Sequence, residues 1–183
     1  MHSPMLSPQV EVLVLVMLMW PPTVFLHECG HALPALLLTR GGVHMNVGAK
    51  STGLRLRAGR LRMTLRPWSS SGNVGGWVEH QNTRVIWLTA ITAGGPLFSF
   101  LGAVASWMLI QRCAPHGFAW LLFAAFGWQC AMQAVFSLLP SRKSPSDGAR
   151  LVWLWRYARN WRRPPQDPNA ATSVPPPSAE AGG

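Results

Sequence analysis

Three long apolar segments constrain the fold of this 183-residue chain more than any other feature. They span residues 12–38, 85–111 and 117–140, and the second and third contain no charged residue. About 20 apolar residues in a helix cross the ~30 Å hydrocarbon core, so each segment is long enough to span a bilayer. The link at 112–116 is short, which favours antiparallel packing of the last two helices. The sequence therefore predicts an all-α membrane protein with three transmembrane helices.

The basic residues lie between these segments and after the last of them. Only 12% of the residues are charged, but the net charge is +10. A nucleic-acid-binding domain would carry such a charge on a soluble fold, so we expect no nucleic-acid partner and instead expect contact with anionic lipids. Because Lys and Arg mark cytoplasmic loops, their distribution predicts an outside N-terminus and a cytoplasmic C-terminus. We expect this topology in a bacterial inner (cytoplasmic) membrane.

The first cytoplasmic loop contains a pattern typical of strands. Residues 54–57 and 61–66 alternate between apolar and polar side chains, which is the period of a strand with one buried face. Residues 58–60 can form the turn between them. The sequence thus predicts a small amphipathic β-hairpin at about 43–66 that lies against the membrane surface.

The C-terminal part contains two different segments. Residues 148–162 are rich in Trp and Arg but too short to cross a bilayer, so they predict an interfacial helix or the end of a broken third span. Residues 164–183 consist largely of Pro, Ala, Ser and Gly, a composition typical of disorder. The prediction is a membrane core at 1–163 followed by a disordered tail.

The first apolar segment contains the sequence HECGH, an HExxH motif, at residues 27–31. On a helix, His27 and His31 lie on one face, where both imidazoles can reach one zinc ion at ~2.0–2.1 Å. Glu28 can then remove a proton from a metal-activated water that acts as the nucleophile. Ionisable side chains inside a membrane span are costly, and this span contains no Lys or Arg to pair with Glu28. The motif therefore predicts one Zn²⁺ per chain rather than a buried ion pair.

A catalytic zinc site usually has three protein ligands and one open position. Two acidic residues, Glu79 and Asp147, remain as candidates for the third ligand once those near the chain ends are set aside. Further candidates are His44, His80 and His116. The residues favour Asp147, because the following Gly148 permits an irregular backbone. The alternative role of Asp147 is the N-cap of the last helix.

Three short motifs occur in order along the chain. They are HECGH in the first span, AGGP at 93–96 and LLPSRKSPSDG at 138–148. Together they resemble the three signatures of the site-2 protease family, which are intramembrane zinc metalloproteases, in a minimal three-span form. The sequence GGW at 75–77 also resembles a glycine pair found in many members. The resemblance extends over residues 12–155.

The resemblance implies a metalloprotease core formed by the three spans. It implies that His27, His31 and Asp147 bind the zinc ion and that Glu28 is the general base. The implied activity is hydrolysis of a peptide bond in or near a transmembrane segment of a membrane-protein substrate. Family members also have strands beside the active site that can pair with an extended substrate, a role open to the predicted hairpin. The alternative is a basic loop that fixes topology and binds anionic lipid.

One position departs from the family pattern. Ser137 stands where members usually have an Asn that is thought to hold the substrate or the oxyanion. Gln133 and Gln129 lie within two turns before it on the same helix and can substitute for that Asn. The predicted substrate-binding or oxyanion-binding residues are therefore Ser137, Gln133 and Gln129.

Two other classes of function remain open from the sequence. One is a non-catalytic, membrane-embedded homologue that binds zinc or a partner protein. The other is a basic membrane-surface adaptor in which the HExxH motif occurs by chance. Glu28 favours the protease, since zinc binding alone does not require a base at that position. The sequence predicts no particular oligomeric state.

Overall fold

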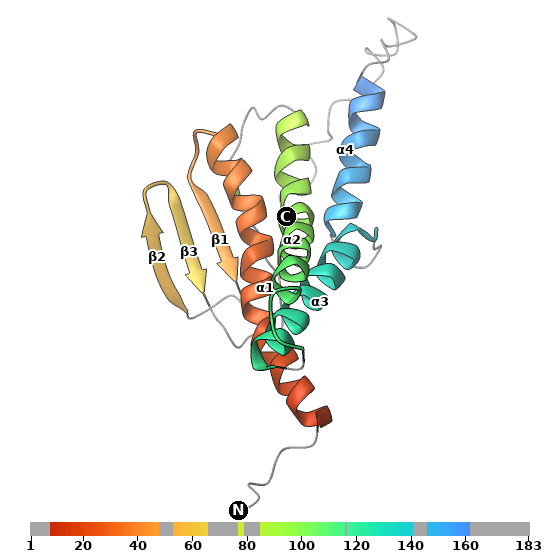
Figure 1. Cartoon of the computed structure of the whole chain (residues 1–183). Coiled ribbons are helices and arrows are strands. Elements are labelled where there is room, and N and C mark those ends of the chain that lie inside the picture. The colour runs from red at the N-terminus through yellow and green to blue at the C-terminus, as the bar shows by residue number, and fades with distance from the viewer. Residues whose placement is uncertain are drawn as a thin grey trace, which may run out of the picture.

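The computed structural model of this chain is mostly helical, with a small sheet on one side of the helices (Figure 1). It describes residues 8–47, 53–65, 77–78, 85–115, 117–140 and 146–161. The helices are α1 (Pro8–Leu38), α2 (Val85–Ile110), α3 (Phe118–Leu138) and α4 (Asp147–Trp161). The strands are β1 (Val43–Val47), β2 (Leu54–Ala58), β3 (Leu61–Leu65) and β4 (Trp77–Val78). The predicted tail at 164–183 and the glycine pair at 75–76 lie outside the described residues.

Three of these helices are long and apolar enough to cross a membrane. The candidate spans are Val10–Leu38, Val85–Ile110 and Phe118–Leu138, which agrees with the three spans predicted. Large apolar side chains such as Met17, Trp107 and Phe136 lie on the outside and are 61–66% exposed. Such a surface is favourable in lipid and unfavourable in water. These features are those of a helical membrane protein.

Small residues fill the contacts between the helices. α2 packs against both α1 and α3. Its buried residues are Thr92, Gly94, Gly95, Pro96, Ser99, Gly102 and Ser106. A side chain on either Gly30 or Gly94 would collide with the backbone carbonyl of the other. The backbones of α1 and α2 therefore touch where HECGH meets AGGP, a close approach that small residues permit in membrane helices.

The sheet contains the predicted hairpin but is larger. β2 and β3 are antiparallel, and Gly59 in the turn between them has a φ of 58°, a left-handed conformation that favours glycine. β1 pairs in parallel with β3 and antiparallel with β4, which gives the strand order β2-β3-β1-β4. Local alternation of side chains predicts the hairpin, but it does not predict the pairing of strands that are distant in sequence.

The sheet packs on the C-terminal half of α1. Val43, Met45 and Val47 of β1 form a buried cluster with Ala32 and Ala35 of α1. Because these strand residues alternate, they share one face of the sheet and bury it against the helix. β1 is thereby held beside the helix that carries HECGH.

The hairpin turn also closes the end of α1. The guanidinium of Arg60 donates to the carbonyl oxygens of Thr39 at 2.6 Å and Leu36 at 2.7 Å. Carbonyls at a helix C-terminus have no partner within the helix, so Arg60 caps α1 and ties the sheet to it.

α4 begins near the end of α3 and runs beside α2 (Figure 1). It corresponds to the helix predicted at 148–162, with Leu154 buried and Trp153 and Trp155 exposed. Its role as an interfacial helix or as the end of a broken third span stays a prediction. The course of α4 places its first residue, Asp147, next to α1.

Candidate metal centre

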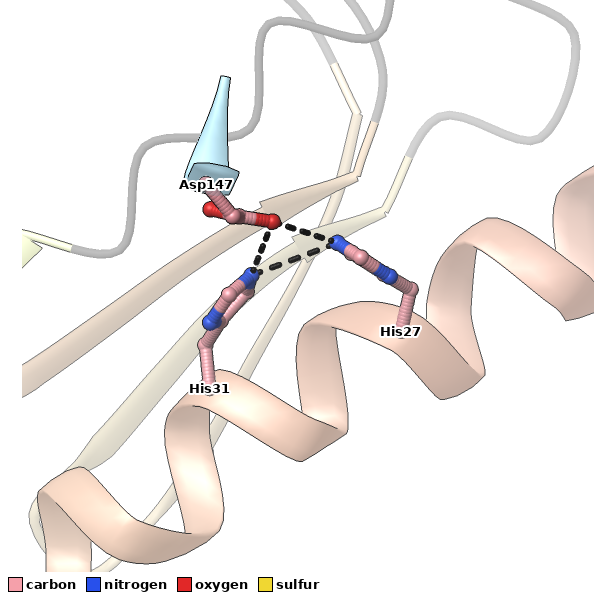
Figure 2. A group of neighbouring side chains, drawn as sticks. All are labelled: His27, His31 and Asp147. Carbon is pink, nitrogen blue, oxygen red and sulfur yellow. Dashed lines mark hydrogen bonds and ion pairs between the residues drawn. The ribbon is translucent and has the colours of Figure 1, made fainter. Parts of the chain in front are cut away.

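Three side chains from α1 and α4 converge at one point (Figure 2). They are those of His27, His31 and Asp147, which together are called the ligand triad. The histidines lie one turn apart on α1, and Asp147 is the first residue of α4. The two histidine Nε2 atoms are 3.3 Å apart. Oδ2 of Asp147 lies 3.2 Å from Nε2 of His27 and 3.4 Å from Nε2 of His31. Among the described residues, this is the one group of three potential metal ligands.

These distances fit a zinc ion. In tetrahedral sites zinc lies ~2.0–2.1 Å from imidazole nitrogens and at a similar distance from carboxylate oxygens, which separates neighbouring ligand atoms by about 3.3–3.4 Å. The three separations of 3.2, 3.3 and 3.4 Å therefore form one triangular face of such a tetrahedron. The fourth corner remains for water or substrate, as in catalytic zinc sites.

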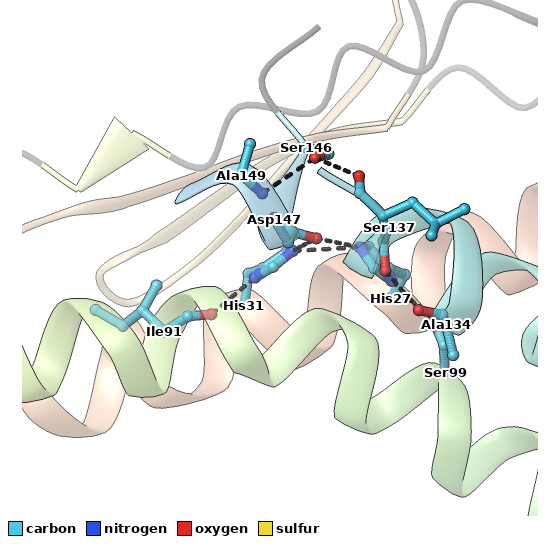
Figure 3. A network of polar contacts seen from close by, with 10 residues as sticks. His27, His31, Ile91, Ser99, Ala134, Ser137, Ser146, Asp147 and Ala149 are labelled. Carbon is cyan, nitrogen blue, oxygen red and sulfur yellow. Dashed lines mark hydrogen bonds and ion pairs between the residues drawn. The ribbon is translucent and has the colours of Figure 1, made fainter. Parts of the chain in front are cut away.

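Hydrogen bonds on the far side of both imidazoles orient the rings (Figure 3). Nδ1 of His31 donates to the carbonyl oxygen of Ile91 at 2.7 Å, and Nδ1 of His27 lies 2.9 Å from Oγ of Ser99. A carbonyl can only accept, so Nδ1 of His31 carries a proton. When the ring is neutral, its Nε2 keeps a free lone pair for a metal ion. When Nε2 is protonated instead, the imidazole donates to the carboxylate of Asp147.

Ser99 and Ile91 are neighbours of the ligand triad that the motifs of the sequence do not predict. Ser99 is fully buried in an apolar span, where a polar side chain is costly unless it is hydrogen-bonded. That cost is a signal that could have found Ser99 in the sequence. Ile91 acts only through its backbone carbonyl, so its role leaves no trace in the residue type.

Gly95 provides the space that the imidazoles occupy. A Cβ at this position would stand 2.5 Å from Cε1 of His31 and 2.8 Å from Nε2 of His27. Any larger residue would therefore displace the ligands. The AGGP motif thus has two functions in this fold, because Gly94 permits the approach of α1 and Gly95 leaves room for the ligand triad.

Ser146, and not Asp147, is the N-cap of α4, so the carboxylate of Asp147 can face the two imidazoles. The hydroxyl of Ser146 accepts a hydrogen bond from the N–H of Ala149 at 3.2 Å and donates to the carbonyl of Leu139 at 2.8 Å (Figure 3). The N-cap role that the sequence leaves open for Asp147 therefore belongs to Ser146.

The surroundings of Asp147 favour its charged form. Burial raises the pKa of this carboxyl, but contacts with the imidazoles of His27 and His31 outweigh burial and hold the pKa below its ordinary value. Gly148 packs so closely on the backbone of Leu138 that a side chain would collide with its carbonyl. This contact fixes the first turn of α4, and with it the carboxylate.

A cavity of about 50 Å³ lies beside the ligand triad. Its polar lining consists of Glu28, His31, His44, Thr92, Asp147 and Arg150. This space is large enough for a few water molecules. Glu28 is buried, with 4% exposure, and shares the cavity with two ligands without belonging to the ligand triad. This is the position that a general base for water requires.

The residues predicted to bind substrate or the oxyanion are not among the described lining of this cavity. The amide of Gln129 donates to the carbonyl of Val16 and accepts from the hydroxyl of Thr23 at 3.3 Å, so it joins α3 to α1. Ser137 donates to a carbonyl of its own helix at 3.1 Å. Gln133 is half-buried on the same helix. The structure thus gives Gln129 and Ser137 contacts within the protein, and the substrate or oxyanion role of the three residues stays a prediction.

Of the other ligand candidates, only His44 lies within the described residues. Glu79, His80 and His116 lie outside the described residues, so the prediction that Glu79 is not a ligand stays a prediction. His44 lines the cavity, but it does not belong to the group of potential ligands.

No family model matches this chain, and no curated protein matches it. The molecule is a mostly helical protein with three candidate membrane spans and a small sheet. It contains a possible metal site made of two histidines and one aspartate.

Proposed function

We propose that this protein is a zinc-dependent intramembrane endopeptidase of the site-2 protease kind. The observation that carries the proposal is the triangle of two Nε2 atoms and one Oδ2 atom, with the carboxylate of Glu28 beside it. Two histidines and one carboxylate are a ligand set that zinc hydrolases use. A site that only stored the ion would not need Glu28.

The proposed chemistry is hydrolysis of a peptide bond by water. Zinc, when bound, supplies the positive charge that lowers the pKa of that water. Glu28 accepts the proton, the water oxygen adds to the carbonyl carbon, and the π electrons move to the carbonyl oxygen. Glu28 then gives the proton to the amide nitrogen, and the C–N bond breaks to release an amine and a carboxylic acid.

The depth of the site suggests the class of substrate. His27 precedes the end of α1 at Leu38 by 11 residues, which is about 17 Å along the helix. A site at this depth would lie inside a hydrocarbon core of ~30 Å, which a soluble peptide does not enter. The proposed substrate is therefore a protein or peptide with a transmembrane segment, cut in or near that segment.

The proposal includes the orientation that the basic residues predict, with the N-terminus outside and the C-terminus in the bacterial cytoplasm. By strand register, one face of the sheet carries His44, Arg62 and Arg57 in one row and Arg55 in the next. A basic face suits contact with the anionic head groups of a cytoplasmic leaflet.

The second candidate function is a non-catalytic zinc-binding or partner-binding homologue. One observation favours it, which is that Ser137 donates its hydroxyl within its own helix. The residue at the position of the family Asn therefore does not present a free donor to a substrate.

The variant Glu28→Gln separates the two candidates. We expect it to keep about one zinc ion per chain and to lose nearly all cleavage of a transmembrane peptide, because the ligands remain while proton transfer is lost. Zinc is measured by elemental analysis of purified protein, and cleavage by mass spectrometry of a peptide reconstituted in vesicles. Full cleavage by Glu28→Gln would contradict the mechanism.

Two further samples complete this experiment. His27→Ala is the control without a ligand, and it should lose both zinc and cleavage. A zinc-loaded wild type that cuts no transmembrane peptide would favour the non-catalytic candidate. A wild type that binds no zinc would favour the membrane-surface adaptor.

A further inference from the structure

The cavity beside the ligand triad contains a buried hydroxyl without a partner. Thr92 of α2 is 9% exposed and lines the cavity, and its hydroxyl makes no hydrogen bond within the described residues. Other threonines of the helices are bonded, since Thr23 donates to a carbonyl at 2.9 Å and Thr89 to that of Val85 at 2.9 Å. Burying an unbonded hydroxyl costs stability, so its retention points to a ligand.

A second donor lines the same cavity from α4. The guanidinium of Arg150 makes no hydrogen bond or ion pair within the described residues, and its charge acts on the carboxylate of Glu28. Arg150 is an exposed residue of α4 that reaches the lining of this cavity. Its planar set of N–H donors suits an oxygen atom that carries negative charge.

Both donors are attached to the segments that hold the ligand triad. Thr92 directly follows Ile91, whose carbonyl orients His31. Arg150 lies in the first turn of α4, three residues after Asp147. Short stretches of helix therefore fix the position of both donors relative to the metal ligands.

The other polar groups considered for this role are engaged or less enclosed. Ser137 donates within its own helix, and Gln129 donates to Val16. His44 comes from β1 and is exposed. Arg150 is exposed too, but it lies on the same helix turn as Asp147, and Thr92 is buried. Peptide hydrolysis needs donors for the negative charge that develops on the carbonyl oxygen, and Thr92 and Arg150 are free to supply them.

We propose that Thr92 and Arg150 donate hydrogen bonds to the carbonyl oxygen of the scissile peptide as it becomes an oxyanion. This assignment rests on the proposed endopeptidase function. When the water oxygen adds to the carbonyl carbon, the π electron pair moves onto the carbonyl oxygen. The two donors stabilise that charge, and neither gives up its proton. Proton transfer stays with Glu28.

The first test measures cleavage of a transmembrane peptide. Thr92→Val keeps the shape of the side chain without the hydroxyl, and Arg150→Gln removes the charge. Each should lower kcat by about 10²–10³-fold, the usual loss of one oxyanion donor, with zinc content and KM nearly unchanged. Thr92→Ser should restore kcat, because it restores the hydroxyl.

Matched controls come from the same helices. Thr89→Val removes a hydroxyl of α2 that is bonded to Val85, and Arg156→Gln removes an exposed arginine of α4; neither residue lines the cavity. Both controls should cut at the wild-type rate. Equal losses in test and control variants, or a wild-type kcat in both Thr92→Val and Arg150→Gln, would overturn the assignment.

The second test does not depend on cleavage. The Co²⁺-substituted protein is titrated with an apolar dipeptide phosphinate and, separately, with the matching thiol. The phosphinate presents anionic oxygens around a tetrahedral phosphorus. Binding of each compound is measured from the visible spectrum of the metal. Thr92→Val and Arg150→Gln should weaken phosphinate binding by at least about tenfold and leave thiol binding unchanged. Equal phosphinate affinity in wild type and both variants, or no binding to the wild type, would refute the assignment.

The two tests together distinguish this assignment from the endopeptidase function. If the wild type binds the phosphinate through Thr92 and Arg150 but cuts no peptide, the endopeptidase function is wrong and the assignment of the two donors stands. If the wild type and both variants cut peptides equally well, the endopeptidase function stands and the assignment of the two donors is wrong.

Discussion

Two polar clusters lie inside the helix bundle, and they differ in how their hydrogen-bonding groups are satisfied. In the cluster formed by Thr23 and Gln129, the hydroxyl donates to the amide oxygen and the amide nitrogen donates to the carbonyl of Val16. In the ligand triad, two imidazole nitrogens and a carboxylate oxygen meet at 3.2–3.4 Å. The first cluster joins α1 to α3 by hydrogen bonds, whereas the second brings three potential metal ligands together.

This difference separates a structural role from a functional one. A polar group inside a membrane protein is expensive, and a closed set of hydrogen bonds recovers that cost by joining helices. A group of potential metal ligands can recover that cost by binding an ion. We therefore expect substitutions in the two clusters to change different properties of the protein.

The largest expected effect concerns the third ligand. Asp147→Ala should abolish both zinc binding and cleavage, because two neutral imidazoles alone offer no charge to balance the ion in a poorly solvated site. Glu79→Ala should keep both. Elemental analysis and the peptide assay measure the two properties. Normal zinc content in Asp147→Ala, with loss in Glu79→Ala, would show that the ligand assignment is wrong.

A methyl group at Gly95 should also disrupt the ligand triad. Gly95→Ala places a carbon against Nε2 of His31 and 2.8 Å from Nε2 of His27, so the rings must move. We expect zinc binding to weaken by more than about 100-fold, beyond the usual loss of a supporting contact. Competition with a fluorescent chelator measures the affinity. Gly42→Ala, whose nearest neighbours are 3.9 Å away, is the control. Equal affinity in both variants would argue against the crowding.

The hydrogen bond behind His27 should have a smaller effect. Ser99→Ala removes the partner of Nδ1 and should weaken zinc binding by about 10–100-fold, the usual effect of a residue that orients a ligand. Ser106→Ala, at another buried serine of α2, should retain the wild-type affinity. The same chelator competition applies. A loss in Ser106→Ala as large as that in Ser99→Ala would show a general packing effect instead.

The smallest effect is expected in the closed cluster, and on stability rather than on zinc. Gln129→Leu leaves the hydroxyl of Thr23 without its partner on α3 and should lower the free energy of unfolding by about 0.6–1.7 kcal/mol. Zinc content should not change. Unfolding in mixed detergent micelles measures the difference. Loss of zinc without loss of stability would show that Gln129 contributes to the metal site.

The sequence predicts the parts of the molecule that depend on local periodicity. The spacing of His27 and His31 places both on one helix face, and alternation at 54–57 and 61–66 predicts the hairpin. The partner strand of that hairpin, β1, could not be predicted, since parallel pairing joins distant segments. Ser99 was missed for a related reason, because its contact depends on how α1 and α2 face each other. The elimination of other acidic residues suggested Asp147, but only its position beside α1 explains why it can be a ligand.

The separation of the ligands along the chain has a consequence for biosynthesis. His27 and Asp147 are 120 residues apart, so about 6–24 s of translation separate them at 5–20 residues per second. During that interval α1 can enter the bilayer with both histidines and Glu28 in place, but the last ligand has not yet been made. A nascent chain therefore cannot bring all three potential ligands together, and the proposed hydrolytic activity would require the final helix to have docked.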